Sequence, residues 1–240
     1  MSFIIKAGTR ILICMLLAML TGCSWNTTTP DSPKESRFNI KSIGKSDIDR
    51  VLDVNVDEAR QYLRELMVKL YKRNPKELKK SQYQDINKNL TRVFDEIHNW
   101  KYEELNNRKS IDAIYLTFDD SYGGDRVFAF VVGLTSMIMA AYDNKTDFYL
   151  FDSVDPQKLY NSARNIEIAV WKLEHNVDKN GELYLYTNSL PGEVPNLSYE
   201  RLLGKLIATQ DSIAIIIAGK TNRAIKTVIQ TMATAVFLPI

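Results

Sequence analysis

Cysteine, histidine, glycine and proline are all scarce in this sequence of 240 residues. It contains two Cys, two His, ten Gly and seven Pro. Two cysteines are too few for a fold built on disulfides, and so little glycine and proline, with no period, excludes a fibrous repeat. Apolar residues make up 45% and charged residues 25%. This is the composition of a globular chain, and it is too apolar for a disordered one.

No charge of one sign dominates the sequence. The formal net charge is +2, from 31 basic and 29 acidic residues. Proteins that bind nucleic acid usually carry a strong basic excess. The composition therefore predicts no nucleic-acid partner.

The first 22 residues have the layout of an export signal. Lys6 and Arg10 form a basic start without an acidic residue, and the apolar run 11–20 follows. Ten apolar residues are too few to cross a bilayer, which takes about 20, but they match the apolar core of a signal peptide. Residues 20–23 then read Leu-Thr-Gly-Cys.

This four-residue stretch resembles the lipobox of bacterial lipoproteins, in which Leu, a small residue and then Gly or Ala precede an invariant Cys. The resemblance implies cleavage before Cys23, a diacylglycerol on its sulfur and an acyl chain on its new amine. Cys14 would leave with the signal, so the mature chain would have no free thiol, which excludes thiol catalysis and cysteine-bound zinc. The alternative is an ordinary signal peptide that happens to end near a cysteine.

The residue after that cysteine implies a location. In enterobacterial lipoproteins an Asp directly after the Cys retains the protein at the inner membrane, and Ser24 stands there instead. The resemblance therefore implies the inner leaflet of the outer membrane, with the protein facing the periplasm and held to the membrane by its acyl chains.

We expect three parts: a signal peptide over 1–22, a lipidated flexible tether over 23–45 and a helical domain over 46–240. The tether is rich in polar turn formers and prolines and has no apolar period. Beyond it, apolar residues recur mostly at helical spacing. The sequence predicts a single all-α domain of about seven or eight helices, with at most a short hairpin.

Cap signatures place several helix starts. Ser46 to Asp49 and Asn55 to Glu58 each have the spacing of a capping box, which predicts a short helix followed by a second one. Asp155-Pro156 opens a helix that ends near His175. Other predicted helices cover 86–100, 127–142, 198–218 and 221–237; residues 111–118 fit either a helix or a strand, and 183–186 fit a short strand.

The segment 127–142 is the most apolar part of the mature chain and carries no charge. Sixteen residues of helix span about 24 Å, short of a hydrocarbon core of about 30 Å, so a buried central helix is favoured over a membrane span. Gly133 and Ala140 lie on one side of it. We predict that this small-residue side packs against Thr231 and Ala235 on the last helix.

Two short motifs resemble ligand-binding loops but fit caps and turns better. Residues 214–221 end in Gly-Lys-Thr like a phosphate-binding loop, but Ala214 stands where glycine is required, so Gly219 is predicted to end a helix. Residues 176–187 begin like an EF-hand loop, but Thr187 stands where a bidentate Glu is required. We therefore expect no nucleotide, no metal and no other cofactor.

Five charged residues form a candidate polar site. Asp119, Asp120 and Asp125 lie in one loop, where they could bind a hard cation or act as an acid–base pair. Asp125 also stands where an N-cap of the following apolar helix is expected. Arg164 and Glu167 lie on a later helix, where local ion pairing on a solvated face is the plainer interpretation.

Three functions remain open. The first is a non-enzymatic interaction or scaffold protein of the cell envelope with a protein partner, because the sequence shows no thiol, metal or nucleotide motif. The second is a binder of an apolar ligand such as a lipid, held between the helices around 127–142. The third is a carboxylate-dependent enzyme that uses the loop Asp119–Asp125.

Overall fold

The computed structural model describes residues 44–190, 192–194 and 196–240. Within these residues the chain forms seven α-helices and two short 3-10 helices, and its only extended pairing is a single bridge between Val177 and Leu183. The all-α prediction is confirmed, whereas the predicted strand at 183–186 is reduced to that bridge. The elements are α2 (Asp47–Arg73), α3 (Pro75–Lys80), α4 (Ile86–Phe94), η2 (Glu103–Leu105), α5 (Ser110–Thr117), α6 (Arg126–Ala141), α7 (Pro156–His175), α8 (Ser198–Thr221) and η3 (Met232–Thr234).

The predicted signal peptide and Cys23 lie outside the described residues, as does all but the end of the predicted tether. The described part begins at Gly44, three residues before α2. The ammonium of Lys45 already pairs with Asp53 on α2 and lies 3.1 Å from Asp147. The helical domain therefore begins at or before Lys45.

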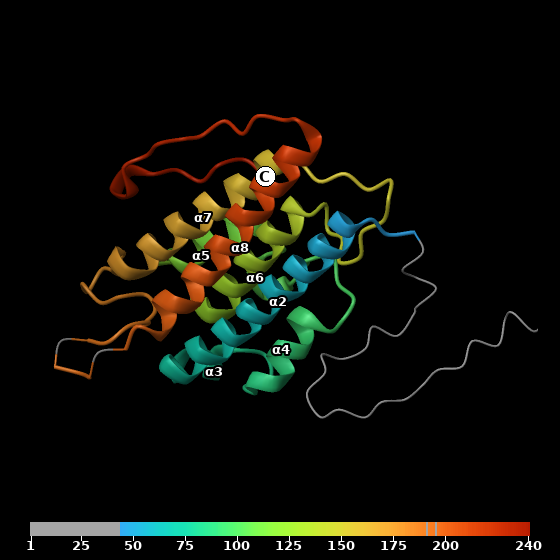
Figure 1. The fold of residues 1–240 in the computed structure, drawn as a ribbon. Coiled ribbons are helices and arrows are strands. Elements are labelled where there is room, and N and C mark those ends of the chain that lie inside the picture. Colours follow the sequence, from blue (N-terminus) through green and yellow to red (C-terminus); the bar gives the residue numbers. More distant parts are fainter. Residues whose placement is uncertain (1–43, 191, 195) are drawn as a thin grey trace, which may run out of the picture. The chain divides into compact units, whose positions relative to one another are not determined.

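Helix α6 lies at the centre of the domain, behind α2 and α8 in Figure 1. Fourteen of its sixteen residues are buried, and it packs against α2, α3, α5 and α7. A helix without charged residues along its length is stable in water only when other elements cover it on all sides. The prediction of a buried central helix over 127–142 is thus confirmed.

Helix α2 is one continuous element of 27 residues. Ser46 caps it with the reciprocal bonds of a capping box, as predicted: its Oγ accepts from the Asp49 N–H, and the Asp49 carboxylate accepts from the Ser46 N–H. The second start predicted at Asn55 is wrong. The Asn55 amide donates to the carbonyl of Val51, 2.7 Å away, so this side chain bonds within the helix and does not cap a new one.

Helix α8 runs past its predicted end. Gly219 lies inside the helix, which ends at Thr221, and Asn222 takes the left-handed conformation (φ 51°) as its C-cap. Asn adopts this conformation more readily than most non-glycine residues. The stop predicted at Gly219 was therefore misplaced by three residues. Helix α4 in turn ends at Phe94, six residues before the predicted Trp100.

The predicted last helix over 221–237 does not form. Apart from η3, residues 222–240 follow a largely extended path, which we call the C-terminal segment. Side-chain amides of α7 bond its backbone, because the Asn165 amide donates to Leu238 O (2.8 Å) and the Asn161 amide donates to Pro239 O (2.8 Å). These tertiary bonds replace helical ones along a stretch rich in β-branched residues, which are weak helix formers.

The close contact predicted at Gly133 exists, but its partner is α5 and not Thr231 or Ala235. A Cβ at Gly133 would lie 2.7 Å from the backbone nitrogen of Ile114. Beside this contact, the Ser136 hydroxyl accepts from the Ser110 N–H at 2.7 Å. Residues 111–118, which fitted either a helix or a strand, are thus a helix held against α6.

Gly133→Ala should lower the free energy of unfolding by about 1–3 kcal/mol, because the added methyl overlaps the α5 backbone. Gly204→Ala in α8 is the matched control: nothing lies within 4 Å of its added Cβ. That change should raise the same free energy by up to about 1 kcal/mol through better helix propensity. Chemical denaturation of both variants measures the difference, and a Gly133→Ala protein as stable as the parent would contradict the contact.

Candidate functional site

Asp125, the most buried of the five candidate residues, caps α6. Its carboxylate accepts from the Phe128 N–H at 3.0 Å and from the Tyr71 hydroxyl at 2.7 Å. Burial raises the pKa of this carboxyl to about 7, although both hydrogen bonds favour the charged form. This geometry confirms the interpretation of Asp125 as the N-cap of α6. Its carboxylate oxygens are used in these two structural hydrogen bonds.

Asp119 and Asp120 lie at the surface and bond to different groups. Asp119 accepts from the hydroxyl and the backbone N–H of Ser121, at 2.7 and 2.8 Å, and these bonds hold the pKa of its carboxyl below the usual value. Asp120 accepts from the Tyr184 hydroxyl at 2.9 Å. The three acidic residues of the loop therefore do not converge on a shared partner.

Arg126 closes the same loop. Its guanidinium donates to the carbonyls of Leu116, Thr117 and Asp119 at the end of α5, at 2.9–3.2 Å. Its backbone N–H donates to the buried carboxylate of Glu77 at 2.8 Å. Carbonyls at a helix end lack intrahelical donors, and here a cationic side chain satisfies them. The charges around the loop thus fix the turn from α5 to α6.

Arg164 and Glu167 form the predicted ion pair, with 3.1 Å between them. Arg164 also pairs with Asp211 of α8 at 2.6 Å, a partner that sequence reasoning missed. No hydrogen bond or ion pair within the described residues joins Arg164 or Glu167 to the acidic loop. The five candidate residues are therefore two separate groups, and this part of the chain contains no set of three His, Cys, Asp or Glu residues placed to hold a metal ion.

A pair of carboxylates that sequence reasoning also missed joins α7 to α8. The Asn188 amide donates to Glu174 (2.9 Å) and to Glu200 (2.6 Å). Burial and the neighbouring Glu200 raise the pKa of Glu174, because two adjacent carboxyl groups do not both ionise readily. No spacing rule could have found the pair, because its members are brought together by the packing of two helices.

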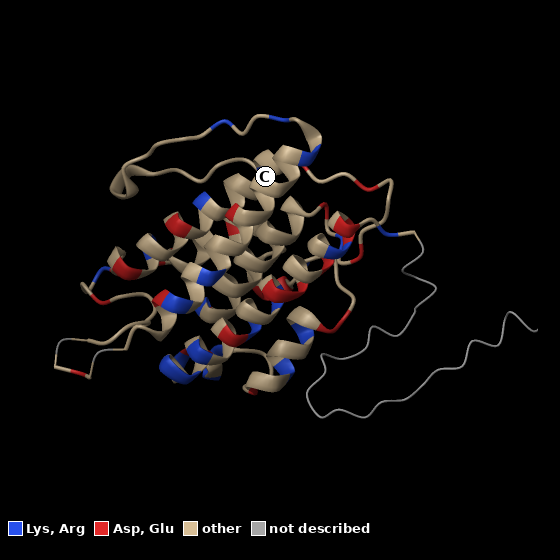
Figure 2. Cartoon of the chain, in the orientation of Figure 1, with Lys and Arg blue, Asp and Glu red and all other residues tan. Residues whose placement is uncertain are grey.

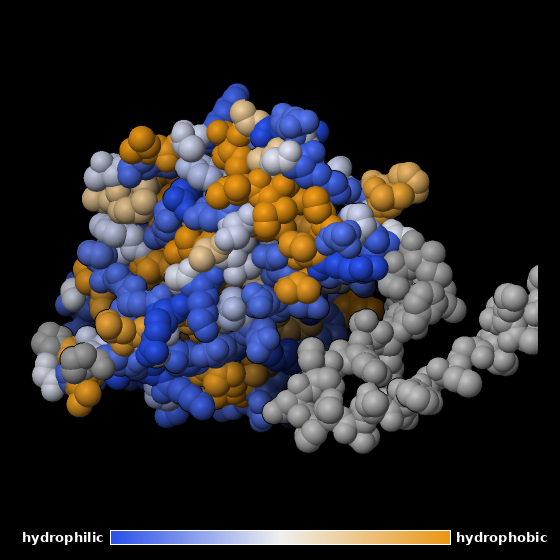
Figure 3. Space-filling view, viewed as in Figure 1, coloured by the Kyte–Doolittle hydropathy of each residue, from blue (hydrophilic) through white to orange (hydrophobic). Residues whose placement is uncertain are grey.

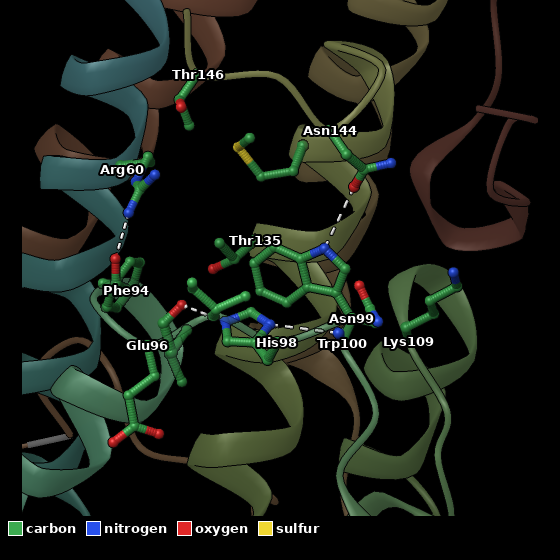
Figure 4. Close-up of a pocket in the computed structure, with 13 residues that line it drawn as sticks. Arg60, Phe94, Glu96, His98, Asn99, Trp100, Lys109, Thr135, Asn144 and Thr146 are labelled. Carbon is green, nitrogen blue, oxygen red and sulfur yellow. Dashed lines mark hydrogen bonds between the residues drawn. The ribbon is translucent and has the colours of Figure 1, made fainter.

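One concave site on the domain is a pocket of about 560 Å³ that we call the α4 pocket (Figure 4). Its walls are formed by α2, by α6 and by the loop that follows α4. Arg60 and Lys109 bring two positive charges to its wall, against one negative charge from Glu96. Thr135 and Met139 of α6 add buried side chains to the wall. This combination suits a small amphipathic anion, because an apolar body can lie on the buried surface while the cations bind its charge.

The aromatic wall of the α4 pocket is held by hydrogen bonds. The Trp100 indole donates to the Asn144 side-chain oxygen at 3.3 Å. The His98 ring pairs through Nε2 with the Val93 carbonyl (2.9 Å) and through Nδ1 with the Trp100 N–H (3.3 Å). These partners require the tautomer with hydrogen on Nε2. Both ring nitrogens are occupied, so His98 supports the loop and does not serve as a free base.

A second notable surface is the exposed side of α8. Besides the cations Arg201 and Lys205 in its first turns, this side carries small and apolar residues that we call the α8 face: Gly204, Ala208, Ser212, Ile215, Ile216 and Gly219. Ile215 is 68% exposed and Ile216 43%. Gly204, Ala208 and Ser212 recur every fourth position and Gly219 follows seven positions later, so the small residues form one stripe along the helix. Sequence reasoning missed this stripe, although the spacing was visible in the sequence.

The α8 face has an apolar neighbour on α2. The two helices run antiparallel, since the Tyr199 hydroxyl at the start of α8 donates to Lys69 O near the end of α2 at 2.8 Å. Ile215 and Ile216 therefore lie toward the end of the pair where α2 begins, as does Val54, which is 57% exposed. In Figure 3 an apolar area lies in the upper middle of the molecule among more polar atoms, near the place where Figure 1 shows the last turns of α8.

Among the described helices, α8 has the length and apolar character to cross a membrane. These two properties are weak grounds, because core helices of soluble proteins share them. Asp211 of α8 is paired with Arg164 on α7, and 39% of the most apolar window of α8 is buried within the domain. In this fold α8 is a packed helix with one exposed side.

Comparison of the chain with protein-family models, curated proteins and solved structures found no match. The candidate sites therefore depend on their geometry and chemistry alone.

Replacing Asp125 should change how stability depends on pH. Its carboxyl has a pKa of about 7 in the folded chain against 3.8 for an ordinary aspartate, so folding favours the protonated form. The parent then loses up to about 1.4 kcal/mol of stability per pH unit as the pH rises through this window. Asp125→Asn keeps an acceptor for the Phe128 N–H and has no proton to lose.

The parent loses stability as the pH rises from about 4 to about 7, because the folded state must then give up the proton of Asp125. The Asp125→Asn protein has no such proton, so its stability relative to the parent should increase over this range and stay constant above it. Urea denaturation of both proteins at several pH values measures the difference, in which the contribution of Glu174 cancels. A constant difference across the range would contradict the buried, protonated Asp125.

Proposed function

We propose that this protein is a lipid-anchored component of the bacterial envelope, in the inner leaflet of the outer membrane, that works by binding a partner protein and not by catalysis. The observation that carries the proposal is the α8 face, an exposed stripe of small and apolar residues on an otherwise packed helix. Contiguous apolar surface on a soluble domain is a frequent mark of an interaction site.

The partner surface that fits the α8 face best is another helix. A Cβ at Gly204 or Gly219 would meet nothing within 4 Å, so the helix backbone is open at both ends of the stripe. Small residues spaced four apart let two helix backbones approach closely. Ile215 and Ile216 then supply apolar area to be buried in the contact.

The anchor is proposed from the lipobox resemblance at Cys23. A flexible tether from Ser24 to about Ile43 would hold the domain on the order of 25 Å from the lipid. The partner would then be a protein of the periplasm or of the membrane itself. The acyl chains confine the domain to this layer and raise its effective concentration there.

The α4 pocket supports a second candidate function, the binding of a small ligand. Met139 and Thr135 belong to α6, the helix around which an apolar ligand was expected. Because Arg60 and Lys109 bring positive charge to the pocket, the ligand that fits it better than an uncharged lipid is an amphipathic acid. Mass spectrometry of an organic extract of the purified protein would detect such a compound.

The enzymatic proposal gains no support from the loop Asp119–Asp125. Its carboxylates bond to Ser121, Tyr184 and the start of α6, which are structural partners. An acid–base pair would need two carboxyl groups directed at one reacting atom.

Cys23→Ala should block processing and membrane attachment, because the cysteine sulfur is the proposed site of lipid addition. Radiolabelled palmitate and the migration of the chain on a gel would report the result, with Cys14→Ala as the matched control that should be processed normally. Cleavage and membrane attachment of the Cys23→Ala chain would refute the lipoprotein assignment.

A photo-crosslinking side chain at Ala208 should give one discrete adduct in cells, whereas the same side chain at Lys179, in an exposed turn, should not. Ser212→Arg, introduced with the Ala208 crosslinker, should abolish the adduct because an Arg blocks close helix contact. Its melting temperature should stay near that of the parent, since position 212 is exposed. An adduct that survives Ser212→Arg would place the interaction elsewhere, and an adduct of two copies would identify self-association.

A further inference from the structure

The end of the chain differs in charge from all that precedes it. After Asp211 the sequence contains no acidic residue, but it contains Lys220, Arg223 and Lys226. Residues 23–211 carry 26 basic and 29 acidic residues. The excess of positive charge is thus confined to the last 29 residues, whereas the larger part of the mature chain is slightly acidic.

The three cations have no acidic partner in the fold. All three are exposed, and none takes part in the twelve ion pairs formed among the described residues. In Figure 2 the basic positions on the upper segment are not interleaved with acidic ones, in contrast to the helices below. Their charge is therefore directed to the surroundings of the protein.

The same segment carries apolar side chains that are exposed to solvent. Ile229 is 98% exposed, Val236 is 64% exposed and Val228 is 39% exposed. Full exposure of an isoleucine costs free energy that burial in an apolar medium would recover. Because exposed cations and exposed apolar side chains occur on one segment, this segment has two properties that a lipid–water interface matches.

The segment that carries these side chains is held in place. Gln157 of α7 bonds Lys226 in both directions: its amide donates to Lys226 O (3.1 Å) and its carbonyl accepts from Lys226 N (2.7 Å). The Tyr160 hydroxyl accepts from Val228 N at 3.2 Å. Because α7 fixes the backbone, the exposed side chains lie on a formed surface, and little ordering is required for binding.

We propose that this surface, made of Lys220, Arg223, Lys226, Val228, Ile229 and Val236, docks on a membrane that contains anionic phospholipid. The cations contact lipid phosphates, and Ile229 enters the boundary between headgroups and acyl chains. A second copy of the chain is a poor occupant, because two such surfaces would bring positive charge against positive charge. The proposal uses the proposed lipid anchor only to explain proximity to a bilayer.

Trypsin gives a direct measure, because Lys220, Arg223 and Lys226 are exposed cleavage sites at or beyond the last turn of α8. The full-length chain is added to vesicles of phosphatidylcholine alone or with about one third phosphatidylglycerol, at about 0.1 M salt. Cleavage after Lys226 should slow about tenfold or more in the anionic vesicles, since each basic residue near such a surface contributes roughly fivefold to binding. Cleavage after Lys179, in the exposed turn before α8, should not change.

Two matched variants test the apolar part of the surface. Ile229→Asp should lose the protection in anionic vesicles, because it places a negative charge at the lipid interface. Ile97→Asp should keep it, since Ile97 is equally exposed, at 105%, but lies in the loop after α4. Salt of about 1 M should also remove the protection, because it shortens the screening length to about 3 Å.

Equal cleavage after Lys226 in both kinds of vesicle would overturn the proposal, and so would protection that needs no anionic lipid or that Ile229→Asp leaves intact. Protection that rises with protein concentration in the absence of vesicles would identify a second copy as the occupant and would overturn it as well. Sedimentation with vesicles at about 1 M salt reports the lipid anchor separately, because acyl attachment survives screening. A chain that does not sediment with vesicles at about 1 M salt, but whose Lys226 site is still protected from trypsin at low salt, would refute only the lipid anchor.

Discussion

Helix α6 carries no charge from Val127 to Tyr142, so any side left in water would expose apolar area. The other helices are arranged to prevent this. α5 approaches so closely that only glycine fits at position 133, and α2, α3 and α7 cover the remaining sides. The interior is filled by packing around one helix, which leaves the pockets at the periphery of the domain.

The cost of burying α6 is visible at its start. The first N–H groups of a helix need acceptors, and at a buried start water does not reach them. Asp125 accepts from the Phe128 N–H, although burial raises the pKa of its carboxyl group. Glu77 accepts from the Arg126 N–H. Acidic residues that resemble a catalytic cluster in the sequence are therefore explained by the ends of two helices.

Local patterns predicted the elements whose ends depend on local chemistry. Ser46 and Asp155-Pro156 began helices where expected, because a cap forms within a few residues of the chain. The prediction of a helix in the C-terminal segment failed because the conformation of this segment depends on Asn161 and Asn165 of α7, which lie more than 70 positions away in the sequence. Of the site residues, the partners Asp211 and Glu200 were missed for the same reason, since only the packing of α7 on α8 brings each to its neighbour.

The two proposed surfaces adjoin without overlapping, which constrains how the domain would sit on a membrane. The C-terminal segment runs along the upper edge in Figure 1, whereas most of α8 crosses the front below it. A bilayer held against the segment by Lys220, Arg223 and Lys226 would leave Gly204, Ala208 and Ser212 open to the periplasm. Lipid contact and partner binding can then occur in one orientation, because the charge asymmetry after Asp211 directs only one edge of the domain to the membrane.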